Sequence, residues 1–296
     1  MDFYKLGGCM RFITSIYTNK QLNTLAPYLD YAMLQSKDAS LNYKDLDLDL
    51  AIDFCKKNNI GIVLSMDKIY QPKTIDLGLS FLKKYKDLCD YFYVTDLGIC
   101  NLAIKLKIEN KIIYDPKTMI TNSLDFDIYA SYGFEALGIS SEIMVKDVIE
   151  IQNKCHKNSF YQVFGERLMF YSKRHLISLY SKKNNENYPK EDVLFREATR
   201  KDYFPGFENE NGTVMYRGYL ISLLKELNNL KDIKYGYIET YTIADDKMIS
   251  VLDIYNKALN DTDINLLLDQ FNELDLKVED GFAYKDSVYQ KEELKL

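Results

Sequence analysis

The chain has 296 residues, of which 47% are hydrophobic and 14% aromatic. That apolar content is enough for a large core, so disorder is excluded for most of the chain. The length suits one large α/β barrel or two modest domains. The 38 basic and 44 acidic residues give a net charge of −6. This disfavours a generic nucleic-acid coat, whose affinity comes from phosphate neutralisation, but leaves a local basic groove open.

The five cysteines are scattered, with no Cys-x-x-Cys pair: Cys9, Cys55, Cys89, Cys100 and Cys155. An odd and dispersed set is typical of reduced cytosolic thiols rather than of a disulfide framework. Residues 1–11 lack the apolar core of a signal peptide, and no run reaches the length of a membrane span. We therefore expect a soluble cytoplasmic protein without membrane attachment. The 25 tyrosines, against no tryptophan, are interpreted as compositional drift without functional weight.

Strand and helix patterns alternate along the chain. Short apolar runs typical of buried strands occur at residues 12–17, 31–35, 61–65, 91–95, 112–114, 136–140, 159–164 and 235–240. Apolar residues at helical spacing occur at 20–29, 48–58, 74–88, 144–155 and 248–259. About eight strands, most of them followed by a helix, predict an α/β fold, namely a (β/α)8 TIM-like barrel with room for an incomplete or irregular circuit. The near-continuous apolar strands are those of a parallel sheet covered on both faces.

The barrel pattern breaks at a polar segment, residues 181–219, which follows a late strand. Long loops in compact domains are usually functional or disordered, and this one falls on the face where barrels keep their active sites. We therefore predict one barrel domain over residues 1–273 that carries this insertion, and a C-terminal extension over residues 274–296.

Four cationic or imidazole side chains crowd into one segment: Arg167, Lys173, Arg174 and His175. One interpretation is a cluster at the barrel mouth that binds an anion, with Arg174 and His175 in catalysis and Arg167 and Lys173 on the substrate. Guanidinium groups suit carboxylate or phosphate oxygens because they offer bidentate donors. The alternative is that these groups form salt bridges with nearby glutamates or with the acidic loop.

The Ser140-Ser141-Glu142 step ends a predicted strand. A glutamate there points into the rim where barrels place catalytic groups, so Glu142 is a catalytic candidate. The alternative is that one of the serines caps the next helix and that Glu142 complements its dipole.

Polar residues also follow another strand, from Asp115 to Asn122. They could line the rim, with Asn122 on the substrate, or Asn122 could cap the helix that follows. Asp96 lies at a comparable strand end, where it is either a rim group or part of a plain turn.

The insertion contains Arg196, Arg200 and Asp202. The two arginines share a face if this part is helical, and Asp202 can pair with either. The Asn211-Gly212 step is a strong hairpin signal. A hairpin held by ion pairs is favoured, and a substrate-lid role for Arg200 and Asp202 comes second.

Several common catalytic motifs are missing. The chain has no Gly-x-Ser-x-Gly elbow, Walker loop, Gly-x-Gly-x-x-Gly or His-Glu-x-x-His. Its two histidines, His156 and His175, do not match zinc-ligand spacing. No metal site is predicted.

The segment 164–178 begins Phe-Gly, continues through Tyr171-Ser172-x-Arg174 and ends Leu-x-Ser. It resembles the signature of peptidase family U32, the collagenase-like proteases. Further family-like elements are Thr95-Asp96-Leu97-Gly98, Thr118-x-x-x-Asn122 and Ser140-x-Glu142. The later residues 196–213 and 281–289 look like the branch associated with prephenate-dependent tRNA uridine hydroxylation.

The resemblance implies particular chemistry. Family members of known role hydroxylate tRNA, ribosomal RNA or quinone precursors without oxygen, usually through a four-cysteine iron–sulfur cluster. This chain has Leu168 and His175 where the family pattern has cysteines, and residues 195–200 supply none. We therefore expect no iron–sulfur cluster and no other cofactor.

The leading hypothesis is an accessory or substrate-binding component of prephenate-dependent tRNA hydroxylation. It would act beside a cysteine-bearing family paralogue, with tRNA and a small carboxylate as ligands. The alternatives are a peptidase or collagenase-like hydrolase, as the family name suggests, and a non-catalytic barrel that binds a small anion. Whether this degenerate member is itself an enzyme stays open.

Overall fold

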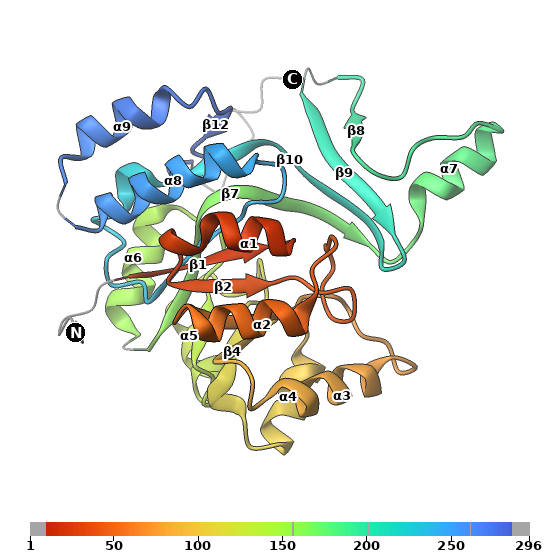
Figure 1. The fold of residues 1–296 in the computed structure, drawn as a ribbon, viewed down its shortest axis with the longest axis horizontal. Helices are drawn as coiled ribbons and strands as arrows, with labels where there is room; N and C mark the ends of the chain where they lie inside the picture. Colours follow the sequence, from red (N-terminus) through yellow and green to blue (C-terminus); the bar gives the residue numbers. More distant parts are fainter. Residues whose placement is uncertain (1–9, 156, 200–201, 261, 286–296) are drawn as a thin grey trace.

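A closed barrel forms the body of the protein. The computed structural model describes residues 10–155, 157–199, 202–260 and 262–285. Over these ranges the parallel strands of the barrel are β1 (Arg11–Ile16), β2 (Tyr31–Leu34), β3 (Gly61–Met66), β4 (Tyr91–Val94), β5 (Ile112–Tyr114), β6 (Ala136–Gly138), β7 (Ser159–Ser172) and β11 (Tyr235–Ile238). Neighbours in this order pair with one another, and β11 also pairs with β1, which closes the circuit. The predicted (β/α)8 barrel is confirmed (Figure 1).

Helices cover the outside of the barrel. They are α1 (Asn19–Leu25), α2 (Leu48–Lys57), α3 (Ile75–Tyr85), α4 (Leu97–Lys105), α5 (Ser123–Ala130), α6 (Val145–Lys154), α8 (Asp245–Ala258) and α9 (Ile264–Asn272). In α2, for example, Leu48, Ile52 and Cys55 lie on one face and are buried, which is the stripe a covering helix needs. Helices α4 and α9 were not predicted. In α4 the Asp96 carboxylate accepts hydrogen bonds from the N–H groups of Gly98 (2.7 Å) and Ile99 (3.3 Å), so Asp96 is a helix cap.

Aromatic side chains fill the barrel interior. Tyr31, Tyr93, Tyr235 and Tyr237 are buried there with Phe160. The Phe160 ring centroid lies 5.2 Å from that of Tyr93 and 5.3 Å from that of Tyr237. Strand residues that point inward pack a barrel core in layers, and here large rings occupy those positions. The tyrosines therefore have a structural role that composition alone did not reveal.

Strand β7 leaves the barrel and continues as part of a second sheet. From Phe164 onward it pairs antiparallel with β10 (Gly212–Ser222). Strand β10 pairs with β9 (Tyr203–Asn209), which pairs with the edge strand β8 (Val193–Arg196). We call this sheet, with helix α7 (Leu176–Asn184), the arm; it projects from the barrel in Figure 1. The hairpin predicted at Asn211-Gly212 is the β9–β10 turn. The strand predicted at 159–164 was too short, because its continuation carries charged residues.

One face of the arm packs over part of the barrel mouth. Phe207, Val214 and Tyr216 are buried there against Leu41, and Tyr241 packs against the same cluster. The other end of the arm is anchored by β12 (Val278–Glu279), which pairs with β10. In the described ranges no helix is both long and apolar enough to cross a membrane.

Gly165 lies where β7 passes from barrel to arm. Its φ of +104° is in the region that favours glycine, and an added Cβ would lie 2.2 Å from the carbonyl oxygen of Glu239. We predict that Gly165→Ala destabilises the protein by about 3 kcal/mol or more, because both strain and a backbone clash oppose the substitution. Urea unfolding gives the free energy.

Gly133 provides the matched control, since its φ is +81° but the nearest atom to an added Cβ is 3.5 Å away. Gly133→Ala is expected to cost about 1 kcal/mol from backbone strain alone. Equal losses for the two variants would show that the close approach to Glu239 has no energetic weight.

Candidate functional site

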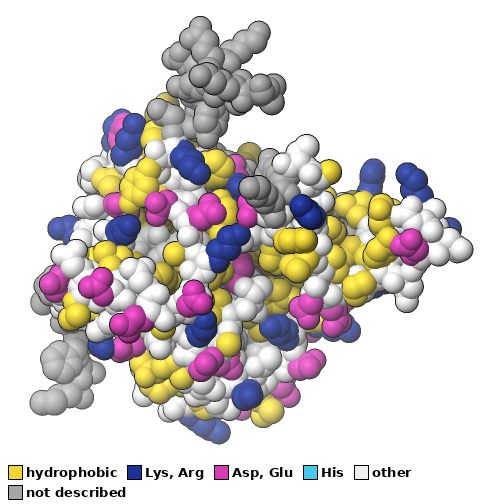
Figure 2. Space-filling model, turned by 90° about the horizontal axis from the view of Figure 1, so that it is seen from above, with side chains coloured by type: hydrophobic (Ala, Val, Ile, Leu, Met, Phe, Trp, Pro, Cys, Tyr) yellow, Lys and Arg dark blue, Asp and Glu magenta, His cyan; other side chains and the backbone are white. Residues whose placement is uncertain are grey.

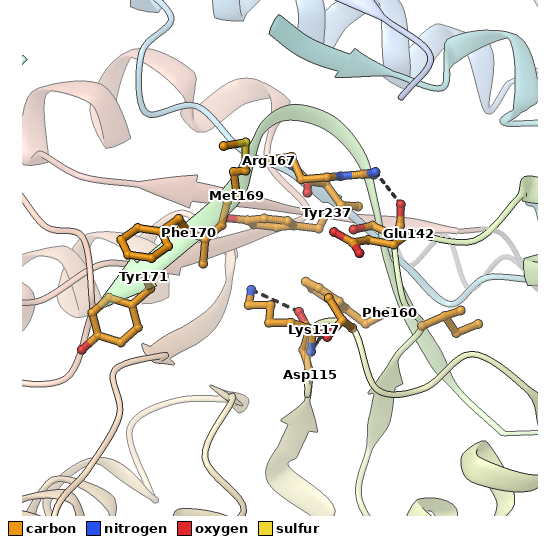
Figure 3. Close-up of a pocket in the computed structure, with 14 residues that line it drawn as sticks. Asp115, Lys117, Glu142, Phe160, Arg167, Met169, Phe170, Tyr171 and Tyr237 are labelled. Atoms are coloured by element: carbon orange, nitrogen blue, oxygen red, sulfur yellow. Dashed lines mark hydrogen bonds and ion pairs between the residues drawn. The ribbon is translucent and has the colours of Figure 1, made fainter. Parts of the chain in front are cut away.

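A cavity of about 180 Å³ opens at the carboxyl ends of β5 and β6 and beside β7. Phe160 and Tyr237 from the barrel interior form its apolar wall (Figure 3). Side chains of the β7 continuation, from Leu168 to Tyr171, lie along another side. The polar lining comes from the segments after β5 and β6 and from β7: Asp115, Lys117, Thr118, Ser141, Glu142, Gln162 and Arg167.

Asp115 and Lys117 form a fixed ion pair at the cavity. Asp115 is 7% exposed and accepts hydrogen bonds from the Tyr93 hydroxyl (2.6 Å) and the Lys117 backbone N–H (2.9 Å). The Lys117 ammonium lies 3.2 Å from the same carboxylate (Figure 3). Gly138 leaves room for this arrangement, because a Cβ there would lie 2.5 Å from Asp115 Oδ1. Asp115 therefore holds Lys117 in place at the cavity wall.

Arg167 is a buried cation with unused hydrogen-bonding capacity. Its side chain lines the cavity, is 5% exposed and donates from Nη1 to the Ser141 carbonyl at 2.5 Å. Its Nε–H has no partner among the described residues. Burial, followed by the nearby charge of Arg217, lowers the pKa of the Arg167 guanidinium. A buried guanidinium with an unpaired donor is stabilised by an anion, so the cavity is suited to one.

A second buried cluster centres on Glu239, next to the cavity wall. Its carboxylate accepts hydrogen bonds from the hydroxyls of Ser15 (2.6 Å), Tyr17 (2.7 Å) and Tyr237 (2.6 Å) and from the N–H groups of Thr240 (2.8 Å) and Tyr241 (3.1 Å). Burial, and then the Glu239 charge, raise the pKa values of Tyr17 and Tyr237 well above the usual range. These hydroxyls therefore stay protonated and donate. Tyr237 joins the cluster to the cavity, since its ring lines the wall.

Glu166 lies beside this cluster and has only part of its carboxyl group satisfied. Its Oε1 accepts hydrogen bonds from the backbone N–H (2.8 Å) and the hydroxyl of Thr242, while Oε2 is buried without a partner in the described chain. Burial, and second the charge of Glu239, raise the pKa of Glu166 to about 8. The carboxyl group is therefore largely protonated at neutral pH, as expected for one of two neighbouring buried carboxyls.

Of the residues predicted for the site, the structure brings Glu142 and Arg167 to the cavity. Glu142 is half-exposed and pairs with Arg217 at 3.8 Å. Ser140 Oγ accepts a hydrogen bond from the Glu142 N–H at 3.2 Å, whereas α6 begins after Met144 without a side-chain cap. The alternative in which one of the serines caps that helix is therefore wrong, because the helix begins too far along the chain.

Lys173, Arg174 and His175 do not line the cavity. They lie at the far end of β7 and the start of α7, where Arg174 and His175 are exposed. Lys173 donates from Nζ to the Ile69 carbonyl at 3.0 Å. A sequence cluster in an extended strand is thus spread out in space, and the proposed catalytic roles of Arg174 and His175 stay predictions.

Four further residues singled out in the sequence are distributed as follows. Asn122 caps α5, accepting hydrogen bonds from the N–H groups of Leu124 and Asp125, each at 3.0 Å. Asp202 pairs with Lys277 at 3.0 Å, and Arg200 lies outside the described residues. Arg196 belongs to strand β8, so the helical pairing considered for it is wrong; its guanidinium lies 5.4 Å from the Tyr203 ring centroid.

Sequence reasoning missed Gln162, Glu166, Tyr237 and Glu239 as parts of the site. A usable signal existed for Glu239, which directly follows the last barrel strand, as Asp115 follows β5. The rule that strand ends carry functional side chains applies to both positions. Glu166 had no such signal, because its position depends on β7 crossing the mouth.

The cysteines do not fit a thiolate-ligated cluster. Cys55, Cys89, Cys100 and Cys155 are buried on the outer layer of the barrel, and Cys9 lies outside the described residues. Burial raises the pKa of the Cys55 and Cys89 thiols to about 12. The described part of the chain contains no grouping of three or more His, Cys, Asp or Glu residues suited to a metal ion. Leu168 lines the cavity and His175 is exposed, and neither supplies a thiolate.

The sequence also matches a known protein family. Residues 28–283 match peptidase family U32, and the chain belongs to that family. The chain is similar to tRNA hydroxylation protein P2 of Bacillus subtilis (strain 168), with 24% identity over 271 residues, which cover 82% of this chain and 85% of the relative.

One solved structure shares the fold of this chain. The structure of the U32 peptidase Mk0906 covers 81% of this chain and 96% of its own, with 13% identity and a TM-score of 0.50. That likeness concerns the fold alone. A spore cortex-lytic enzyme from Bacillus cereus matches more loosely, with 9% identity and a TM-score of 0.41 over 92% of this chain and 76% of its own.

The raised pKa of Glu166 predicts that the free energy of unfolding falls as pH rises. In the unfolded chain this carboxyl loses its proton near its ordinary value of 4.5, whereas in the fold it does so only at about 8. The stabilising contribution of the bound proton is therefore complete at low pH and is lost as pH rises through this window. Glu166→Gln removes the titration. The stability of the variant relative to wild type should rise between about pH 5 and pH 8, by up to about 1.4 kcal/mol per pH unit.

Urea unfolding at several pH values measures this difference. Glu142→Gln is the matched control at the same rim, because Glu142 is half-exposed and shows no such burial. A flat difference between Glu166→Gln and wild type across the window would contradict the assigned protonation.

Proposed function

We propose that this protein is the substrate-binding component of a tRNA hydroxylation system and that its cavity holds a small organic anion. The observation that carries the proposal is Arg167, a buried guanidinium that lines the cavity and keeps an unpaired Nε–H. A guanidinium at the wall of a cavity offers charge-assisted hydrogen bonds to a carboxylate that enters. The RNA pathway is suggested by the similarity to tRNA hydroxylation protein P2.

The character of the cavity favours a ring-bearing carboxylate. Arg167 supplies positive charge, Lys117 adds an ammonium group that is paired with Asp115, and Phe160 and Tyr237 supply a flat apolar wall. A ligand with a ring and a carboxylate can meet both at once, as in ordinary ligand sites where a few polar groups fix orientation. Prephenate, the small carboxylate implied by the family resemblance, has this chemistry.

The accessory role follows from the donor set. The usual family cluster needs cysteines, and the described cysteines are buried apart from the cavity with raised pKa values. In this proposal a cysteine-bearing paralogue carries out the redox step and this chain supplies the ligand.

A peptidase role has less support. The cavity hydroxyls are those of Ser141 and Thr118, along with the Tyr171 and Tyr237 phenols. Nucleophilic catalysis by Ser or Thr requires a base within hydrogen-bond reach, and no such bond to Ser141 Oγ or Thr118 Oγ1 is found among the described contacts. A non-catalytic anion-binding barrel shares the Arg167 observation and is separated from the main proposal by the cellular test below.

Arg167→Lys keeps the charge but removes the planar fork. We predict a ten- to hundredfold loss of affinity for prephenate, because a charge-assisted hydrogen bond contributes about 1.5–3 kcal/mol. Isothermal titration calorimetry on the full chain measures this. Arg174→Lys is the control, being the same substitution outside the cavity. Thermal unfolding of both variants separates lost binding from lost folding, and undiminished affinity in a folded Arg167→Lys variant would reject the assigned site.

The cellular role is tested by mass spectrometry of tRNA nucleosides. A deletion strain should lose a hydroxylated uridine, and the wild-type gene should restore it while Arg167→Lys restores it poorly. An unchanged nucleoside profile in the deletion strain would reject the hydroxylation role. If prephenate still binds in that case, the anion-binding barrel is the better description.

A further inference from the structure

The outer end of the arm exposes apolar and cationic side chains together. Helix α7 lies there, away from the barrel (Figure 1). Its Leu179 and Tyr180 side chains are 55% and 57% exposed. Figure 2 shows hydrophobic side chains along the arm, with Lys or Arg side chains at its projecting end. The last turn of α7 contains Lys182 and Lys183.

The cationic side chains of this surface are available for binding. Within the described ranges, no hydrogen bond or ion pair engages the side chains of Arg174, Lys182 or Lys183, and all three are exposed. Neighbouring lysines differ in this respect, since Lys173 binds a carbonyl and Lys190 lies 3.7 Å from Glu208. The positive charges of Arg174, Lys182 and Lys183 are thus available to a partner.

Helical geometry sets their spacing. From Leu176, the first residue of α7, to Lys183 the helix rises by about 10 Å, at about 1.5 Å per residue. Tyr180 and Lys183 are three residues apart and Leu179 and Lys183 are four apart, so these side chains are neighbours on the helix surface. The surface therefore presents one exposed ring flanked by cations at both ends of the helix.

The helix is held in a fixed position. Glu208 is buried and accepts hydrogen bonds from the N–H groups of Ile177 (2.8 Å) and Ser178 (3.1 Å) at the start of α7. Burial by itself would raise the pKa of Glu208. The hydrogen bonds from these N–H groups and from the hydroxyls of Ser178 and Thr213 outweigh burial, so the pKa of Glu208 is lowered. A carboxylate at a helix N-terminus is stabilising. The Tyr180 ring also packs on Tyr188, with centroids 5.3 Å apart.

We propose that this end of the arm is an RNA-contact surface. Arg174, Lys182 and Lys183 neutralise phosphates, and the exposed face of Tyr180 stacks on an unpaired base. Phosphate neutralisation and base stacking are the two contributions from which proteins build contacts to unpaired nucleic acid. The partner is a folded RNA with accessible loop bases, and the choice of RNA rests on the proposed function.

Charge complementarity selects this occupant over a protein. The cores of protein interfaces are depleted in lysine, whereas here lysines flank the exposed ring. The chain as a whole has a net charge of −6 and repels a polyanion. Contact with RNA therefore concentrates where uncommitted cations gather.

The test is fluorescence anisotropy of full-length protein with labelled bulk tRNA at several salt concentrations. Replacing Arg174, Lys182 and Lys183 together by alanine should weaken binding at least tenfold at low salt. It should also reduce the slope of log Kd against log salt by about 2, because about 0.7 is lost per phosphate contact to a single strand. Tyr180→Ala should weaken binding roughly tenfold without changing the slope, since stacking does not depend on counterions.

The matched control is the double variant Lys56→Ala with Lys57→Ala, which removes two exposed lysines from the last turn of another helix, α2. Its affinity for tRNA should equal that of wild type. The proposal is overturned if wild type does not bind tRNA at low salt. It is also overturned if the triple alanine variant of the arm and the α2 control variant bind tRNA equally well, whether or not both bind more weakly than wild type. Binding to phosphatidylserine vesicles is measured for the same proteins. If the triple alanine variant loses binding to these vesicles but still binds tRNA like wild type, the proposal is also overturned. These outcomes are independent of the nucleoside profile of the deletion strain, so the surface and the proposed function fail separately.

Discussion

Five hydrogen bonds converge on the buried carboxylate of Glu239, at the seam where the first barrel strand meets the last. A buried charge is costly unless its oxygens are satisfied, and here the donors come from β1, from Tyr17 just beyond it, and from β11 and the two residues that follow Glu239. Satisfying this one group therefore fixes how the two strands meet. The rest of the barrel mouth is built around that seam.

Strand β7 crosses the barrel mouth next to this seam. Gly165 brings the strand within contact of the Glu239 backbone, and beyond it β7 joins the arm. The arm packs on Tyr241, next to the seam, and leaves the side near β5 and β6 open. The cavity is thus the part of the mouth that the arm does not cover. The buried carboxyl of Glu166 is held close to Glu239 because Glu166 follows Gly165 directly.

The cationic residues Arg167 and Arg174 are close in sequence but lie in different parts of the structure. Arg167 and Arg174 are seven residues apart, and an extended strand rises about 3.3 Å per residue, so their backbones are separated by about 23 Å if the strand runs straight. Arg167 turns into the cavity, while Arg174 reaches the start of α7. Strand β7 therefore runs from the proposed ligand site toward α7, which carries the proposed RNA surface.

The sequence by itself determined the barrel and much of its rim. All the barrel strands were predictable because buried parallel strands are continuous apolar runs, and the polar residues that follow β5 and β6 were predictable because strand ends meet at one rim. Arg167 was also among the predicted residues, although nothing local separated it from Arg174. Helix α7 buries Ile177 and exposes most of its surface, so it had little apolar periodicity to detect. Only the tertiary structure decided which cations are buried, that Glu166 and Glu239 are neighbours, and that the arm leaves the cavity open. These facts depend on the path of β7 across the mouth, which is set by contacts between residues more than seventy positions apart, such as Gly165 and Glu239, and such pairings leave no periodic pattern in the chain.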